Sequence, residues 1–413
     1  MLLVLHSNTV ILLELIRGGL WGTEVSLSNC EDIDYSSVMQ LAEEQSVVGL
    51  VTAGLERVED VKIPQQWSLQ FIGSTLQLEQ RNKSMNAFVA LLISKMRAAG
   101  IYTLLVKGQA IAQCYEKPLW RACGDVDLFL SEENYAKAKE ILVPLATSVE
   151  KEYEREKHLG MSIDGWVVEL HGRLYCGLSS RIERELDDIY VNTFNGGNVR
   201  SWNNNGVQVF QLGIENDVFY VFTHILQHFY KEGVGLRQIC DWCRLMWTYR
   251  DKIDVQKLKS RLKRAGIMSE WKAFYALASK YLGMPDLDSQ DSQARMSDQR
   301  SSARLTSVES ATSRHSSNNF GSEHDSIADF MVCDSRFDKK ADRILEFILK
   351  SGNMGHNRDM SHFSKYPYLI RKCVSMGRRV SDLINHARIF PLDSLRFFPR
   401  IMFNGVRSAI RGE

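Results

Sequence analysis

The sequence predicts an α+β fold in which a mixed β-sheet core is surrounded by helical regions at both ends of the chain. Apolar and β-branched runs typical of strands gather between residues 98 and 212. The regions before and after carry apolar residues at helical spacing. A strand-helix-strand succession followed by a hairpin signal favours a sheet with both parallel and antiparallel pairs.

Composition places the chain among ordinary globular proteins. Its 413 residues are 44% hydrophobic and 24% charged, with a net charge of +1, and this length suggests about two to three domains. Eight cysteines are too sparse for a disulfide scaffold. We find no signal peptide, and no apolar run reaches the roughly 18–20 residues of a transmembrane helix. We therefore expect a cytoplasmic protein with reduced thiols.

Changes in pattern divide the chain into five regions. We expect an N-terminal helical region (1–97), an α/β core (98–212), a second helical region (213–285), a Ser-rich insertion (286–325) and a basic C-terminal helical region (326–413). The insertion has almost no large apolar residues, so it cannot bury enough surface to offset the entropy of ordering. We predict that it is disordered, and a regulatory phosphorylation segment is the sharper alternative.

Individual elements follow from periodicity and from turn residues. Strands are expected at 101–106, 126–130, 158–163 and 167–171, with further edge strands at 189–194 and 207–212. Helices are expected at 9–16 (ended by Arg17-Gly18-Gly19), 38–44, 49–55, 67–72, 76–97, 109–116, 132–142, 217–230, 236–250 and 337–350. Residues 366–413 predict two or three helices broken at Pro391 and Pro399. The dipeptide Asp164-Gly165 predicts a hairpin between two of these strands.

The most informative stretch begins where the strand 101–106 ends. Gly108 permits a tight turn directly after Lys107, and it opens the helix predicted at 109–116. The backbone amides at the start of a helix attract phosphate oxygens. This strand end therefore predicts a phosphate-binding turn.

A pair of acids opens the next predicted strand, 126–130. Side chains alternate along a strand, so the carboxylates of Asp125 and Asp127 point to one face. Two carboxylates this close repel each other unless a cation lies between them. Oxygen ligands of this kind suit Mg²⁺ bound together with substrate phosphates.

These residues together resemble a known superfamily. Lys107-Gly108, Pro118, Arg121 and the run Gly124-Asp125-Val126-Asp127-Leu128 resemble the nucleotidyltransferases related to DNA polymerase β. More narrowly, they resemble its bacterial branch labelled uncharacterised nucleotidyltransferase, in which Lys-Gly replaces the Gly-Ser or Gly-Gly turn. The superfamily has a third carboxylate on a later strand, and Glu169 fits that position.

The resemblance implies transfer of a nucleoside monophosphate from an NTP, such as ATP, to an acceptor hydroxyl with release of pyrophosphate. Asp125, Asp127 and Glu169 are implied as catalytic residues that hold two Mg²⁺ ions, with Mn²⁺ as a substitute. The residues that we assign to nucleotide binding are Lys107, Gly108, Arg121, His171, His224, His228, Arg237 and Asp241. A simple ion pair is the alternative role for Arg121. A non-catalytic nucleotide-binding or regulatory module is the alternative for the whole protein.

Two histidines in the second helical region allow three interpretations. His224 and His228 are four residues apart and share one helix face. With Cys240 and Cys243 they supply four ligands of the type that bind zinc, although cysteines within a helix more often pack in the core. Contact with the nucleotide or the acceptor is the third interpretation. The run His-x3-His, Gly-x-Gly-Leu-Arg-Gln and Asp-Trp resembles the same family, which implies that this helical pair lies over the active site.

The C-terminal region has an excess of basic residues. From residue 365 onward the chain has ten Lys and Arg residues and three acidic residues. Such asymmetry is compatible with nucleic acid or another anionic surface as a partner. A solvated helical face with its apolar side turned inward is the interpretation we favour.

Overall fold

The computed structural model describes residues 7–30, 32–286, 335–353 and 366–411. Its centre is a seven-stranded sheet in the order β3-β4-β5-β2-β1-β7-β6. The strands are β1 (Thr103–Val106), β2 (Asp125–Leu130), β3 (Ser148–Val149), β4 (His158–Ile163), β5 (Trp166–His171), β6 (Val199–Asn204) and β7 (Val207–Leu212). The β2–β5 and β1–β7 pairs are parallel and the other pairs antiparallel. The predicted mixed sheet in an α+β fold is confirmed.

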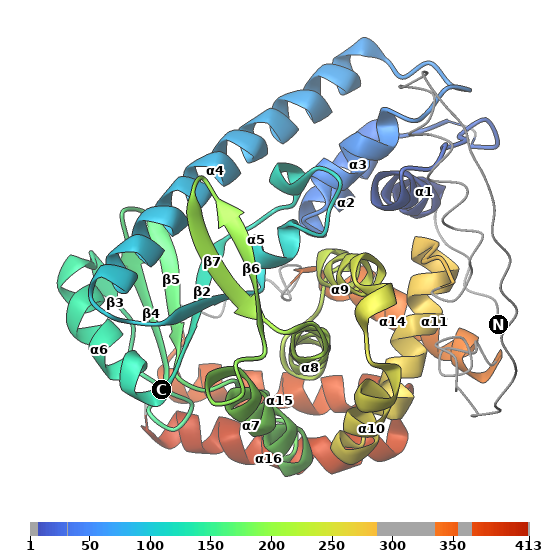
Figure 1. Ribbon diagram of the computed structural model, residues 1–413. Helices are drawn as coiled ribbons and strands as arrows, with labels where there is room; N and C mark the ends of the chain where they lie inside the picture. Colours follow the sequence, from blue (N-terminus) through green and yellow to red (C-terminus); the bar gives the residue numbers. More distant parts are fainter. Residues whose placement is uncertain (1–6, 31, 287–334, 354–365, 412–413) are drawn as a thin grey trace, which may run out of the picture.

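Helices surround this sheet (Figure 1). The α-helices are α1 (Ser7–Trp21), α2 (Tyr35–Glu44), α3 (Val48–Leu55), α4 (Gln65–Ala98), α5 (Gly108–Ala112), α6 (Glu132–Leu142), α7 (Ser180–Phe194), α8 (Ile214–Lys231), α9 (Leu236–Thr248), α10 (Val255–Ala265), α11 (Met268–Leu282), α14 (Ser335–Ser351), α15 (Tyr368–Ala387) and α16 (Pro391–Arg411). Short 3₁₀ helices are η1 (Pro118–Trp120), η2 (Val143–Leu145) and η3 (Arg250–Lys252). No helix in the described part of the chain is long and apolar enough to cross a membrane.

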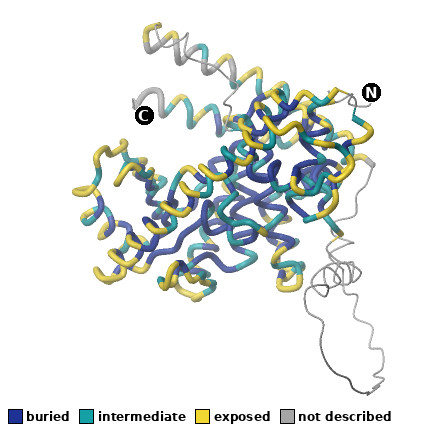
Figure 2. Tube along the Cα trace, turned by 90° about the horizontal axis from the view of Figure 1, so that it is seen from above, coloured by how far each residue is buried: buried dark blue, intermediate teal, exposed yellow. Residues whose placement is uncertain are grey.

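The two faces of the sheet pack against different helices. On one face, Val126, Leu128 and Leu130 of β2 are buried in a cluster that includes residues of α4 and α6. On the other face, Phe129 is buried in the larger cluster that includes α1, α3, α8, α9 and α11. Figure 2 shows that the buried residues gather in the interior of the molecule. Because side chains alternate along β2, Asp127 lies on the same face as Phe129, toward α8.

The hairpin β4–β5 confirms the sequence prediction. Asp164 and Gly165 have φ values of +50° and +80°, as a two-residue turn of the mirror-image type requires. The turn fixes the register so that His158 pairs with His171 and Gly160 pairs with Glu169.

The predicted end of the first helix is wrong. Helix α1 continues through Gly18 and Gly19 to Trp21. A Cβ atom at Gly19 would lie 2.1 Å from the carbonyl oxygen of Leu50 on α3. These glycines therefore allow the two helices to approach closely, and they do not end α1.

The predicted edge strands also need correction. The segment 189–194 belongs to α7, whose start is capped by the Ser179 hydroxyl accepting a hydrogen bond from the Ile182 amide. Ile182, Leu186 and Ile189 recur at helical spacing and are buried. The segment 207–212 is a strand, β7, but it lies inside the sheet between β1 and β6.

Other boundaries shift without changing the architecture. The helix predicted at 109–116 is the short helix α5, which ends at Ala112. The segments 67–72 and 76–97 form one helix, α4. Pro391 opens α16, whereas Pro399 lies inside that helix, so the break predicted at Pro399 is wrong. Residues 287–325 of the predicted Ser-rich insertion lie outside the described residues.

Candidate active site

The turn after β1 brings Lys107 to the edge of the acidic face. Lys107 and Gly108 have φ values of +56° and +35°, and a positive φ is strained for a lysine but not for a glycine. A Cβ atom at Gly108 would lie 3.1 Å from the Sγ atom of Cys123, and a residue with a side chain would also have to adopt the positive φ. The turn therefore depends on glycine at this position, and the Lys107 ammonium lies beside β2.

Three carboxylates converge on this face from two parallel strands. Asp127 on β2 pairs in register with Glu169 on β5, and Asp125 lies two residues before Asp127. One oxygen from each of the three carboxylates lies within 4.8 Å of the others. The charge of Asp127, together with burial, raises the pKa of Asp125. The structure thus brings the three predicted acids together in a place that favours cations.

Asp127 is the centre of the cluster. It is 2% exposed, and its Oδ1 atom lies 2.6 Å from Nζ of Lys107 and 2.8 Å from Nε2 of His171. Burial disfavours the charged form of Lys107, but the negative charges of Asp127 and its neighbours outweigh burial and raise the pKa of the ammonium group. Lys107 is therefore a permanent positive charge on this face.

A second group of possible ligands overlaps the first. One atom each from His158, Glu169 and His171 lie within 4.8 Å of one another, and His158 Nε2 is 3.2 Å from Glu169 Oε2. Burial raises the pKa of Glu169, but hydrogen bonds from both histidines and the charge of Lys107 lower it by more than burial raises it. This carboxylate is therefore ionised. Sequence reasoning missed His158 as a site residue. Its pairing with His171 across the predicted hairpin was the signal that could have found it.

The two histidines of α8 line up behind Lys107. Nε2 of His224 lies 3.5 Å from Nζ of Lys107 and 3.2 Å from Nε2 of His228. Burial and the charges of Lys107 and His228 lower the pKa of His224, so its imidazole is neutral and can accept a hydrogen bond from the ammonium. His228 Nδ1 is 3.0 Å from Glu232. The structure thus places His224 next to Lys107 at the site, whereas His228 lies behind His224 and next to Glu232.

Arg121 and Asp241 form a buried bidentate ion pair. The Arg121 guanidinium donates to both carboxylate oxygens of Asp241 at 3.0 and 2.6 Å, and the Tyr115 hydroxyl donates to the same carboxylate at 2.7 Å. Arg237 lies 3.6 Å from Asp241. The ion pair that is the alternative role for Arg121 is therefore observed. Its buried Nη1 atom makes no hydrogen bond with any described residue.

A small cavity joins these groups to the acids. Its volume is about 50 Å³. The residues that line it include Lys107, Gly108, Arg121, Asp125, Asp127, His224, Arg237 and Asp241. Basic and acidic side chains thus share one cavity wall.

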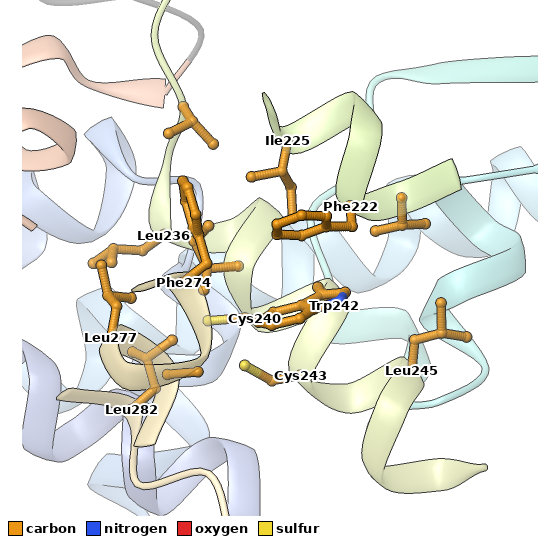
Figure 3. Packing of buried hydrophobic residues seen from close by; sticks show 14 of the residues in the cluster. Phe222, Ile225, Leu236, Cys240, Trp242, Cys243, Leu245, Phe274, Leu277 and Leu282 are labelled. Atoms are coloured by element: carbon orange, nitrogen blue, oxygen red, sulfur yellow. The ribbon is translucent and has the colours of Figure 1, made fainter. Parts of the chain in front are cut away.

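Cys240 and Cys243 lie away from this cavity. Both thiols are fully buried in the core around Trp242, Phe222 and Phe274 (Figure 3). Burial raises the pKa of Cys240 and Cys243 well above the ordinary value of a thiol. The groups of possible metal ligands among the described residues do not include either cysteine. The structure therefore agrees with core packing and gives no support to the zinc interpretation.

The mixed sheet, with acids from β2 and β5 beside a glycine turn, has the arrangement expected of a nucleotidyltransferase. The sequence pattern of one family, described as Uncharacterised nucleotidyltransferase, matches residues 31–283. The match spans more than half of the chain, and the chain therefore belongs to this family. Comparisons with curated proteins and with solved structures found no match. The bacterial origin implied by the sequence resemblance stays a prediction.

Proposed function

We propose that the protein transfers a nucleoside monophosphate from an NTP, with ATP as the first candidate, to an acceptor hydroxyl and releases pyrophosphate. The observation that carries this proposal is the convergence of Asp125, Asp127 and Glu169 within 4.8 Å beside the buried ammonium of Lys107. Membership of the family supports nucleotidyl transfer as the general reaction class.

The three carboxylates fit divalent cations. Their oxygens are the hard ligands that Mg²⁺ and Mn²⁺ prefer, and the raised pKa of Asp125 reflects repulsion from Asp127 that a cation would relieve. When bound there, a pair of such ions would neutralise the triphosphate and lower the pKa of the acceptor hydroxyl. Asp125 and Asp127 would hold both ions, and Glu169 would complete the site nearer to β4.

The positive groups of the cavity hold the nucleotide. Lys107 binds the triphosphate, and the amide of Gly108 at the start of α5 donates to a phosphate oxygen. Arg237, whose side chain is 18% exposed, reaches the same cavity from α9. These groups stabilise the negative charge that builds on the departing pyrophosphate.

The acceptor oxygen forms a bond to the α-phosphorus while the bond from that phosphorus to the pyrophosphate oxygen breaks. Glu169 accepts the hydroxyl proton, and His158, which is 3.2 Å away and has a side chain 23% exposed, donates a hydrogen bond to this carboxylate. His171 keeps Asp127 and Glu169 in position through its contacts of 2.8 and 3.4 Å.

A non-catalytic nucleotide-binding module is the alternative. The observation that favours it is the close pair between Lys107 and Asp127, because an ammonium already neutralises the central acid. On this alternative, NTP stabilises the protein but no pyrophosphate appears.

The deciding experiment is incubation of the purified chain with each α-labelled NTP, Mg²⁺ or Mn²⁺, and candidate acceptors. The proposal predicts pyrophosphate and a labelled product for the wild type and neither for Asp127→Asn. Asp164→Asn is the matched control, because it makes the same chemical change in the β4–β5 turn and asparagine accepts its φ of +50°. Wild-type protein that binds NTP yet releases no pyrophosphate with any acceptor supports the alternative.

A further inference from the structure

A second, larger hollow lies near His158, whose ring is 6.0 Å from the ring of Tyr153 in the groove wall and whose Nε2 atom is 3.2 Å from Glu169. This groove has a volume of about 840 Å³ and lies between the segment before β4 and the paired helices α15 and α16. Basic side chains from three helices line it, namely Lys231 of α8, Arg379 of α15 and Arg407 of α16. Tyr153 and Tyr175 add aromatic surface. Figure 1 shows α15 and α16 together along one side of the molecule.

Two of the basic side chains are positioned over glycines. Arg379 donates to the carbonyl oxygen of Ile401 at 3.3 Å, and a Cβ atom at Gly405 would lie 2.0 Å from its Nη1 atom. Lys231 donates to the carbonyl oxygen of Cys176 at 2.7 Å. A Cβ atom at Gly177 would lie 2.7 Å from Nζ of Lys231. The absence of side chains at these glycines leaves room for both cations in the groove wall.

The strand order connects the groove to the acids. In the order β1-β2-β5-β4, Asp127 pairs with Glu169 and His171 pairs with His158. The His158 ring lies 6.0 Å from the ring of Tyr153 in the groove wall. A row of side chains thus runs from the small cavity through the acids to the groove. A nucleotide in the cavity and an acceptor in the groove would meet at the acids.

The charge of the groove indicates what it holds. Five basic residues line it, namely Lys151, Arg155, Lys231, Arg379 and Arg407. Three glutamates, Glu152, Glu154 and Glu156, line it as well, so positive charges outnumber negative ones, and Glu152 already accepts hydrogen bonds from Tyr135 and Lys139. Lys231, Arg379 and Arg407 come from α8, α15 and α16 and line the same groove as this segment. Arginine and lysine side chains of this kind bind phosphate groups.

We propose that the groove binds the acceptor of the transfer reaction and that this acceptor carries a phosphate group, held by Arg379, Arg407 and Lys231, close to the hydroxyl that attacks. This inference rests on the proposed nucleotidyl transfer. The acceptor phosphate itself does not react, and the hydroxyl oxygen attacks the α-phosphorus of the nucleotide. Helices α15 and α16 lie outside the matched range 31–283, so the groove depends on a part of the chain that the family pattern does not cover.

Two sources share this chemistry, a small sugar phosphate and the 3′ end of a nucleic-acid strand. The test measures binding to the wild-type chain without NTP, so that no reaction can occur. The probes are ribose 5-phosphate, followed by calorimetry, and a short fluorescent single-stranded RNA with a free 3′ hydroxyl, followed by anisotropy. Binding of one probe and not the other identifies the source.

We expect Arg379→Ala combined with Arg407→Ala to weaken binding by about a hundredfold, because each lost charge-assisted contact accounts for roughly a factor of ten. Arg388→Ala at the end of α15 is the matched control, since it removes the same charge from an exposed residue and should bind like the wild type. Gly405→Ala keeps the charge of Arg379 but displaces its guanidinium, so it should weaken binding as well.

The inference is overturned if the wild type binds neither probe, or if the double variant binds as tightly as Arg388→Ala. Stabilisation by MgATP in a thermal-shift assay is measured in parallel on all variants. If MgATP does not stabilise the wild type, the result counts against the proposed function alone. Intact MgATP stabilisation with unchanged probe binding in the double variant counts against the acceptor groove alone.

Discussion

The ammonium of Lys107 and the carboxylate of Asp127 form a buried ion pair, with Nζ and Oδ1 2.6 Å apart and side chains that are 14% and 1% exposed. Asp127 thus attracts Lys107, whereas it repels Asp125, which lies two residues away on the same face. The negative charge of Asp127 raises the pKa of Asp125. One aspartate therefore compensates a buried cation, whereas the other adds repulsion. The two aspartates should therefore differ in their effect on the free energy of unfolding, although both are proposed to be needed for catalysis.

We predict that Asp127→Asn destabilises the protein by about 3 kcal/mol, because the ammonium of Lys107 loses its nearest partner and keeps only the weaker attraction of Glu169 and Asp125. Asp125→Asn removes a like charge from the cluster, so the free energy of unfolding stays the same or rises. Urea denaturation without divalent cations measures both. Both variants should lose stabilisation by MgATP. Equal destabilisation by the two substitutions would contradict this account.

The second prediction concerns Arg121 and Asp241, which are buried and joined by two hydrogen bonds. Asp241→Leu alone should cost about 3–5 kcal/mol, since it leaves Arg121 as an unpaired buried charge. Arg121→Met alone should cost less, because Arg237 stays 3.6 Å from Asp241. The double variant should cost clearly less than the two single costs combined, because no isolated charge remains. Chemical denaturation of all four proteins completes the cycle. Additive costs would show that the two side chains act independently.

The features that sequence reasoning predicted are local. A strand that ends at Lys107-Gly108, two acids that alternate on a strand, and an Asp164-Gly165 hairpin all depend on residues close in the chain. Because the hairpin fixes register, it also placed Glu169 on a strand that could lie beside the aspartates. The family resemblance supplied only the expectation of a third carboxylate on a later strand, and the parallel pairing of β2 with β5 that brings Glu169 beside the aspartates is visible only in the structure.

The features that sequence reasoning missed depend on contacts between distant segments. Nothing near Arg121 identifies Asp241, which lies more than a hundred residues away, as its partner. The glycines of α1 have the appearance of a helix stop, and their real role is visible only once Leu50 of α3 packs against them. The segment 189–194 is rich in residues that also favour strands, and the buried face of α7 overrides that preference.

The third prediction is a pH dependence that arises from Glu270 of α11, which is fully buried. Burial, with a contribution from Asp393, raises the pKa of Glu270 to about 8. The facing groups are Tyr230 of α8, whose hydroxyl donates to the carboxylate at 3.2 Å, Lys340 of α14, and Asp393 and Arg396 of α16. The site therefore favours a neutral carboxyl group.

The sign follows from proton binding. Between the unfolded pKa of about 4.3 and the folded pKa of about 8, the folded state holds a proton that the unfolded state has lost. Stability from this group is therefore present at low pH and is lost as pH rises through that window. Glu270→Gln should remove this slope and make the protein more stable than the wild type above about pH 7. Thermal unfolding at several pH values measures it, and parallel curves for the two proteins would refute the prediction.

The last prediction compares two glycines in helices. A Cβ atom at Gly54 of α3 would lie 2.0 Å from the carbonyl oxygen of Leu15 on α1, whereas a Cβ atom at Gly73 of α4 would meet nothing within 4 Å. Gly54→Ala must therefore push two helices apart, and we expect a loss of about 1–3 kcal/mol or more. Gly73→Ala only reduces the freedom of the unfolded chain, and it should stabilise the protein by about 0.5–1 kcal/mol. Denaturation midpoints that shift in the same direction for both variants would show that the contact between α1 and α3 is not as close as the structure places it.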